Sequence, residues 1–138
     1  MLAAGAVPVT RDPSAGPVRV LVVEDNEEVT RFLQDLLTGN GYEVVQARNG
    51  VEAMVALTAP PEECPHVVLL DIGLPLESGV SVLSFLRNVL RSGLPVIVLT
   101  GSADEQEEQV IREMGVSAYL RKPTSSEHLL TAIAEAIR

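Results

Sequence analysis

The chain has 138 residues, 46% of them apolar and 21% charged, which fits one globular domain with its own core. A formal net charge of −9 and 3% aromatic residues argue against direct binding to nucleic acid, which favours basic surfaces and stacking rings. No apolar run is long enough to span a membrane, and the start lacks the basic residues of a signal peptide. The single cysteine, Cys64, cannot form an internal disulfide. We therefore expect a soluble cytoplasmic domain that contacts neither nucleic acid nor membrane.

The first 17 residues, "MLAAGAVPVTRDPSAGP", are rich in Ala, Gly and Pro and show no sustained hydrophobic period. This composition predicts a flexible N-terminal extension over residues 1–17. The domain itself is then expected to occupy residues 18–138.

The first strand is predicted over residues 18–25, "VRVLVVED", because β-branched residues dominate it. The segment after it spaces its apolar residues as one face of an amphipathic helix, which should pack inward. That face comprises Val29, Phe32, Leu33, Leu36 and Leu37.

The rest of the chain continues the alternation of strands and helices. Strands are predicted over residues 42–47, 67–71, 95–100 and 118–122, and helices over residues 51–57, 80–90, about 103–114 and from about 127 to the C-terminus. Two capping boxes are predicted to begin the last two helices, with Ser102 and Thr124 as the N-caps.

Alternating strands and helices indicate right-handed crossovers and a parallel sheet that is covered on both faces. The predicted fold is α/β, a flavodoxin-like doubly wound five-stranded parallel sheet of order 2-1-3-4-5 with five helices.

Polar side chains stand at the carboxyl ends of four of the predicted strands. The first strand ends with Glu24 and Asp25, the third with Asp71, the fourth with Thr100 and the fifth with Lys122. Sites in open parallel sheets form beyond these strand ends, so the five residues are expected to meet at one edge.

Three converging carboxylates repel one another, and a hard divalent cation with an all-oxygen shell, such as Mg²⁺, would relieve that repulsion. Glu24 and Asp25 alone are equally compatible with a solvated acidic run that caps the following helix. Asp71 at the neighbouring strand end favours the metal interpretation.

A metal site does not require Lys122 or Thr100, and either residue alone could be an ordinary strand end. Together they suit an anion, because an ammonium neutralises charge and a hydroxyl donates a hydrogen bond. Cation-binding and anion-binding groups around one carboxylate predict phosphoryl transfer to Asp71.

Four fragments in this order, "VLVVEDNE", "LLDIGLP" with Gly79 four residues beyond it, "VIVLTG" and "AYLRKP", resemble the receiver domain of two-component response regulators. The resemblance covers residues 18–138. It implies that Asp71 is the phosphoacceptor, with Asp25, Asp71 and the backbone carbonyl of Gly73 as Mg²⁺ ligands and Glu24 bound through water.

The same resemblance implies that Lys122 pairs with the phosphoryl oxygens and that Thr100 moves to donate a hydrogen bond to them. Tyr119 stands at the switch-aromatic position and would fill the space that Thr100 vacates, entering from the surface; its other interpretation is a strand aromatic at a sheet edge. The peptide bond between Lys122 and Pro123 is expected to be cis. The altered surface would be formed by the fourth helix, fifth strand and fifth helix.

The implied phosphodonor is a histidine kinase or a histidine phosphotransfer protein, and the implied downstream partner is an effector protein or domain. The domain would be no enzyme beyond assisting its own phosphorylation and dephosphorylation.

Three alternatives remain open. A flavin or nucleotide binder on this fold would need a phosphate loop where the acidic "EDNEE" stands, and an aspartate-nucleophile hydrolase would need a second acid in place of Gly73. A degenerate receiver that acts as a phosphorylation-independent binding scaffold is disfavoured by the intact polar residues at the strand ends.

Overall fold

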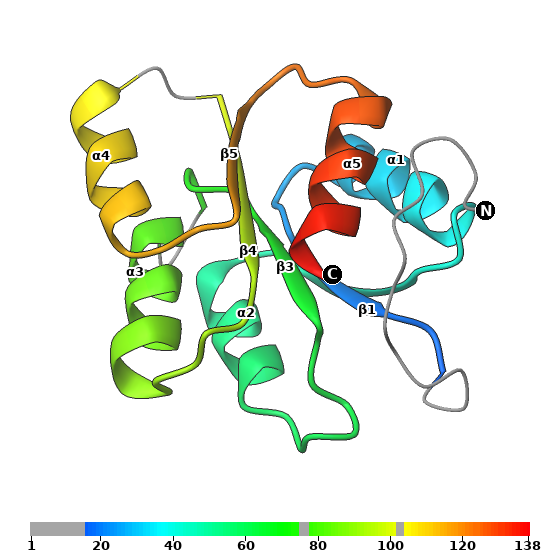
Figure 1. Ribbon diagram of the computed structural model, residues 1–138, viewed down its shortest axis with the longest axis horizontal. Coiled ribbons are helices and arrows are strands. Elements are labelled where there is room, and N and C mark those ends of the chain that lie inside the picture. Colours follow the sequence, from blue (N-terminus) through cyan, green and yellow to red (C-terminus); the bar gives the residue numbers. More distant parts are fainter. Residues whose placement is uncertain (1–15, 75–77, 102–103) are drawn as a thin grey trace.

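The computed structural model describes residues 16–74, 78–101 and 104–138. Strands and helices alternate along the chain, as the hydrophobic pattern predicts (Figure 1). The elements are β1 (Arg19–Val23), α1 (Glu27–Thr38), β2 (Glu43–Ala47), α2 (Gly50–Leu57), β3 (Val67–Leu70), α3 (Gly79–Ser84), the π-helical segment η2 (Phe85–Val89), β4 (Val96–Thr100), α4 (Glu105–Glu113), β5 (Ala118–Arg121) and α5 (Ser126–Ala136).

The five strands form one parallel sheet in the order β2-β1-β3-β4-β5, which confirms the predicted topology. The chain winds outward in one direction from β1 and in the other from β3, so the order of strands reverses between these two neighbours. Val23 of β1 is in register with Leu70 of β3. The residues that follow both strands therefore emerge side by side at the carboxyl edge, where ligand sites of this fold lie.

Helices cover both faces of the sheet: α1 and α5 lie on one face, and α2, α3 and α4 on the other (Figure 1). Successive residues of β1 enter opposite cores, Val20 and Val22 on the α1/α5 side and Leu21 and Val23 on the other. All four are at most 1% exposed. Burial of such side chains is worth about 1.5–3 kcal/mol each, so β1 is a rigid support for the residues that follow it.

Two predicted helix caps are wrong by one or two residues. The N-cap of α4 is Asp104 rather than Ser102, which lies outside the described residues, and the N-cap of α5 is Ser125 rather than Thr124. The Asp104 carboxylate accepts hydrogen bonds from two backbone N–H groups of the first turn, and a charged acceptor suits the positive end of a helix better than a hydroxyl does. The hydroxyl of Ser125 accepts one such hydrogen bond at 3.0 Å.

The helix predicted over residues 80–90 changes pitch partway along. Its first part is α3 and its second part is η2, where the Leu90 N–H donates to the Phe85 carbonyl at 3.0 Å, one residue further back than in an α-helix. From η2 the Arg87 guanidinium donates to the carbonyls of Ser92 and Gly115. These hydrogen bonds tie η2 to the loop before β4 and to the end of α4.

The inward face predicted for α1 is only partly correct. Leu33 and Leu37 are buried against the sheet, whereas Phe32 is 53% exposed. Phe32 lies with Val29 on the side of α1 that borders α5 rather than on the side that faces the strands. Hydrophobic spacing places residues on a helix face but does not tell how far the neighbouring helix covers that face.

Within the described ranges, no helix is long and apolar enough to cross a membrane.

Gly79, the first residue of α3, packs directly on the backbone that follows β3. Its N–H donates to the Ile72 carbonyl at 2.9 Å, and a Cβ at this position would lie 2.6 Å from the Asp71 carbonyl oxygen and from the Ile72 Cα. Because both of these atoms are backbone, they cannot rotate away. The close approach fixes the loop that carries Asp71.

We predict that Gly79→Ala lowers the free energy of unfolding by about 1–3 kcal/mol, because the methyl group must displace backbone beside Asp71. Gly93→Ala is the matched control, since a Cβ there meets nothing within 4 Å and its effect should stay within about 0.5 kcal/mol. Urea unfolding followed by circular dichroism measures both. Equal losses in the two variants would contradict the steric account.

Candidate functional site

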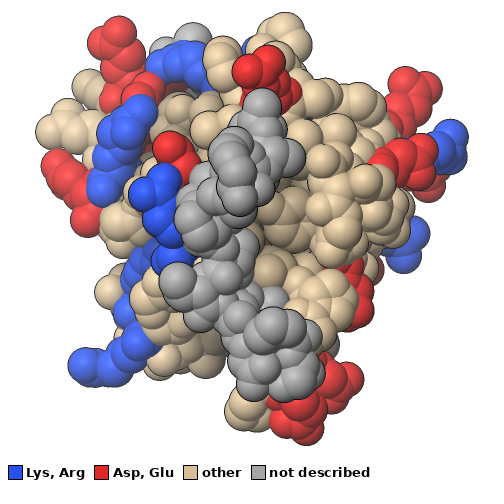
Figure 2. Space-filling view, turned by 45° about the vertical axis from the view of Figure 1, so that its right-hand side comes forward, with Lys and Arg blue, Asp and Glu red and all other residues tan. Residues whose placement is uncertain are grey.

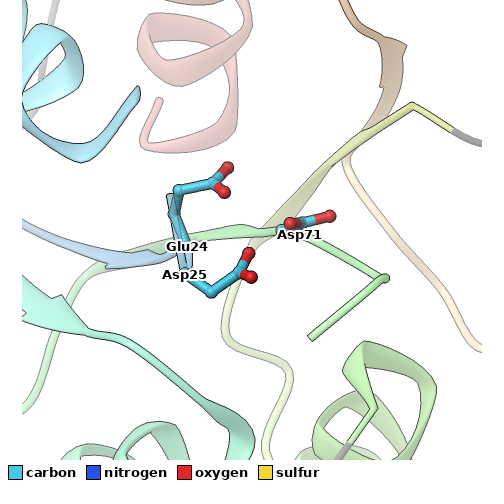
Figure 3. Close-up of side chains that lie close together, drawn as sticks. All are labelled: Glu24, Asp25 and Asp71. Atoms are coloured by element: carbon cyan, nitrogen blue, oxygen red, sulfur yellow. The ribbon is translucent and has the colours of Figure 1, made fainter. Parts of the chain in front are cut away.

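Three carboxylates meet at the carboxyl edge of the sheet, as predicted. Glu24 and Asp25 follow β1, Asp71 follows β3, and one carboxylate oxygen from each lies within 4.8 Å of the other two. The Asp25 carboxylate points toward Asp71, whereas Glu24 turns toward the α1/α5 side (Figure 3). Glu24 and Asp71 are buried, at 3% and 8% exposure, and Asp25 is exposed. The cluster is therefore open to solvent on the Asp25 side.

Backbone hydrogen bonds hold the buried acids in place beyond the formal ends of the strands. The Glu24 N–H donates to the Ala47 carbonyl and the Asp71 N–H to the Val23 carbonyl, both at 3.0 Å. The Gly73 N–H donates to Asp71 Oδ1 at 3.1 Å, which orients the carboxylate from its other side. Asp71 thus has little freedom to move away from the other acids.

Lys122 reaches the same cluster from the end of β5, two strands away from β3. Its Nζ lies 2.7 Å from Glu24 Oε1 and 3.6 Å from Asp71 Oδ2. Its backbone N–H donates to the Thr100 carbonyl at 2.7 Å, which anchors the residue to β4. Lys122 lies closer to Glu24, the more deeply buried acid, than to Asp71. A buried carboxylate costs more free energy when it is unpaired than an exposed one does, so the pairing with Glu24 stabilises the structure more.

The pKa values of Glu24 and Lys122 are both raised, although burial and charge act against each other in each residue. Burial raises the pKa of Glu24, and the hydrogen bonds from Lys122 and from the Asn26 N–H offset part of that rise. Burial lowers the pKa of Lys122, but the Glu24 and Asp71 carboxylates outweigh it and raise the pKa above its usual value of 10.5. Lys122 therefore remains a cation throughout the neutral range.

Thr100, the last residue of β4, is only 2% exposed. The peptide bond between Lys122 and Pro123 is cis, as the resemblance implies.

Tyr119 lies inside the molecule rather than at the surface from which it was expected to move. It is 9% exposed and packs in the core beneath α3 and α4. Its hydroxyl is buried, and the part of the chain that the structure describes offers it no hydrogen-bond partner. The guanidinium carbons of Arg112 and Arg121 lie 5.4 and 6.0 Å from the ring centroid. Glu108 bridges these two arginines, at 2.8 Å and 2.6 Å. We call Glu108, Arg112 and Arg121 the arginine clamp of Tyr119.

Sequence reasoning missed the arginine clamp. The i,i+4 spacing of Glu108 and Arg112 was a usable signal for one ion pair on a helix. The contribution of Arg121 had no such signal, because it depends on how α4 packs beside β5.

The model of the family described as "Response regulator receiver domain" matches residues 20–134. The polar-differentiation response regulator DivK of Brucella anthropi is 39% identical to this chain over 119 residues, covering 85% of this chain and 94% of that protein. The DivK protein of Brucella ovis is 38% identical over 116 residues, covering 83% and 91%.

Solved structures agree with this assignment. A CheY-like response regulator receiver domain protein from Methanospirillum hungatei superposes with a TM-score of 0.82 at 29% identity, covering 88% of this chain and 94% of that chain. The BeF3-activated N-terminal receiver domain of RstA from Klebsiella pneumoniae gives a TM-score of 0.78 at 29% identity, covering 87% and 98%. Sequence, fold and the acidic cluster between β1 and β3 agree, and the chain belongs to the response regulator receiver domain family.

Proposed function

We propose that this domain is the phosphoacceptor switch of a two-component system or phosphorelay and that Asp71 accepts the phosphoryl group. The observation that carries the proposal is the position of Asp71 at the carboxyl end of a central strand, within reach of two more carboxylates and of the Lys122 ammonium. The donor is a phosphohistidine of a kinase or a phosphotransfer protein. We expect the reaction to take place in the cytoplasm, with an effector protein or domain reading the result.

In this proposal an Asp71 carboxylate oxygen attacks the phosphorus of the phosphohistidine. A P–O bond forms, the P–N bond breaks, and the imidazole leaves with the electron pair and is then protonated. Lys122 needs only to turn from Glu24 toward the phosphoryl oxygens, because it already lies 3.6 Å from Asp71 Oδ2. The domain supplies the nucleophile and the charge, and it also hydrolyses its own acyl phosphate, but it turns over no other substrate.

The donor set fits Mg²⁺. We propose that Asp25, Asp71 and the Gly73 carbonyl bind the ion directly and that Glu24 acts through water. The exposure of Asp25 leaves room for the waters that Mg²⁺ retains, and the hydrogen bond from Lys122 already occupies one oxygen of Glu24. When bound, the ion supplies positive charge that lowers the repulsion between the carboxylates and an incoming phosphoryl group.

The proposed output is a change in the surface of α4, β5 and α5, with Thr100 and Tyr119 as the switch residues. Thr100 would donate a hydrogen bond to the phosphoryl group and leave more space for the Tyr119 ring. One charge-assisted hydrogen bond is worth roughly 1.5–3 kcal/mol, whereas a complete population switch takes about 5.5 kcal/mol. Thr100 therefore acts together with Lys122 and the repacking around Tyr119.

A second candidate is a scaffold that binds its partner without phosphorylation. The observation in its favour is that Tyr119, whose ring was expected to move inward from the surface, already lies buried against the arginine clamp. The two candidates differ in whether Asp71 takes up a phosphoryl group.

We predict that incubation with acetyl phosphate and Mg²⁺ adds one phosphoryl group to the chain, as measured by intact mass. Asp71→Asn should abolish the adduct, because an amide is a poor nucleophile, whereas Asp35→Asn, an exposed position on α1, should retain it. Chelating the Mg²⁺ should reduce labelling by at least about tenfold. Equal labelling of wild type and Asp71→Asn would rule out Asp71, and no labelling at all would favour the scaffold.

We predict that Asp71→Asn stabilises the domain in the absence of divalent cations, by on the order of 1 kcal/mol or roughly 2–6 °C in Tm, because it relieves repulsion among the three carboxylates. Added Mg²⁺ should raise the Tm of the wild type and have a smaller effect on Asp71→Asn and on Asp25→Asn. Asp35→Asn should respond to Mg²⁺ like the wild type. Thermal melts with and without MgCl₂ measure this, and an equal Mg²⁺ response in all variants would contradict the proposed ligands.

The arginine clamp is predicted to open at low pH. The hydrogen bond from Arg112, together with that from Arg121, lowers the pKa of Glu108 below its usual 4.5 despite an opposing effect of desolvation. A carboxyl whose pKa is lowered by folding contributes stability above its unfolded pKa and loses it as the pH falls through the folded pKa. The NMR signals of the Tyr119 ring should therefore be constant above about pH 4.5 and move below it.

Glu108→Gln should shift the Tyr119 ring signals at neutral pH and flatten their acid titration. Glu113→Gln, an exposed position on the same helix, is the matched control and should titrate like the wild type. An unchanged acid titration in Glu108→Gln would show that the clamp does not control the ring.

A further inference from the structure

The loop between β1 and α1 carries two of the three acids, and only one of them is held directly. Glu24 is fixed by the hydrogen bond of its backbone N–H to β2 and by Lys122 at its carboxylate. Asp25 has no such support, because in the part of the chain that the structure describes neither its backbone nor its side chain makes a hydrogen bond or an ion pair. Its carboxylate nevertheless points toward Asp71 (Figure 3). The orientation of Asp25 therefore depends on how its two neighbours in the loop are held.

Surface charge is a poor substitute for such support. On the side of the molecule that carries α1 and α5, uncharged side chains form a broad area and the charged ones lie around its margin (Figure 2). Ion pairs between exposed side chains contribute little to stability, because water and salt screen them. A buried hydrogen bond to the backbone of the loop is the more effective restraint, since water does not compete for it.

Thr30, in the first turn of α1, supplies a hydrogen bond of this kind. It is 9% exposed, and its hydroxyl lies 3.0 Å from the Asn26 carbonyl oxygen and 3.4 Å from the Glu24 carbonyl oxygen. These two carbonyls belong to the residues on either side of Asp25. The two acceptors share one hydroxyl hydrogen, so the shorter contact, to Asn26, is the stronger. Thr30 thus restrains the backbone on both sides of Asp25.

Asn26 links this restraint to the neighbouring acid. Its side chain caps α1 by accepting from the Val29 N–H at 3.1 Å, and its own N–H donates to Glu24 Oε2 at 3.2 Å. Both the N–H and the hydroxyl of Thr30 donate to the Asn26 carbonyl, each at 3.0 Å. Removal of the hydroxyl therefore loosens the residue that begins the helix and contacts the Glu24 carboxylate.

A threonine hydroxyl that donates to the carbonyl four residues back is common in helices and by itself indicates no function. Thr38, near the other end of α1, is exposed and makes such a hydrogen bond to the Gln34 carbonyl at 2.7 Å. Both acceptors of Thr38 lie within the helix. Thr30 differs because it is buried and because its second acceptor lies outside the helix, in the loop that carries Asp25.

We propose that Thr30 is a positioning residue of the acidic cluster: its hydroxyl holds the loop from Glu24 to Asn26 in the conformation that directs the Asp25 carboxylate toward Asp71. The fold then orders this carboxylate before any ion binds. In consequence, loss of the hydroxyl weakens the binding of Mg²⁺ and leaves the nucleophile in place. This consequence rests on the proposed function, whereas the ordering of the loop does not.

The first measurement uses the metal-free full chain and backbone ¹⁵N relaxation. The Asp25 and Asn26 amides should have order parameters near about 0.85 in the wild type, as in a rigid backbone, and below about 0.7 in Thr30→Val. Thr30→Ala removes the same hydroxyl without a β-branched side chain and should give the same result. Thr30→Ser, which retains the hydroxyl, and Thr38→Val should keep the wild-type values. Unchanged order parameters in Thr30→Val, or an equal fall in Thr38→Val, would overturn the proposal.

The second measurement is the dependence on Mg²⁺. The Mg²⁺ concentration at half-saturation, followed by the Gly73 amide shift, should rise about tenfold in Thr30→Val, because groups that orient metal ligands change metal affinity by about 10–100-fold. The rate of labelling by acetyl phosphate at saturating Mg²⁺ should fall much less than the affinity. A wild-type half-saturation in Thr30→Val would overturn the consequence for Mg²⁺. If the wild type binds no Mg²⁺, the proposed function fails, and the relaxation data still decide whether Thr30 orders the loop.

Discussion

Mutual repulsion among Glu24, Asp25 and Asp71 is the constraint on which the rest of this structure depends. Three carboxylates within 4.8 Å of one another are costly, and two of them are buried. The packing of the sheet offsets this repulsion, because β1 and β3 are interior strands with both faces covered. The Lys122 ammonium, at the end of β5, reduces the repulsion further. The result is an acidic cluster whose carboxylate oxygens lie close enough together to hold a metal ion.

The same arrangement links the site to a distant surface. Lys122 and Tyr119 lie three positions apart at the end of β5, so the strand that supplies the ammonium also carries the aromatic ring under the arginine clamp. Thr100 lies at the end of the neighbouring strand, and its carbonyl accepts from the Lys122 N–H. Adjacent residues of β4 and β5 thus lie between Asp71 and the arginine clamp, and the proposed switch would act through them.

The sequence allowed much of this to be predicted, because the signals are local. Apolar runs that end in Glu24 and Asp71 mark buried strands and their carboxyl ends, and alternation with helices indicates the parallel order. The preference of Lys122 for Glu24 was not predictable, because it depends on distances across three strands. The close approach of Gly79 to backbone and the exposure of Phe32 beside α5 depend likewise on packing between elements, which no periodicity encodes.

The measurement that tests the central claim most directly is chemical location of the phosphoryl group. Borohydride reduction of the acetyl phosphate-treated domain converts an aspartyl phosphate into homoserine, which peptide mass spectrometry assigns to one position. The account predicts homoserine at position 71, formed only when Mg²⁺ is present. Homoserine at position 25 instead, or equal formation without Mg²⁺, would contradict it.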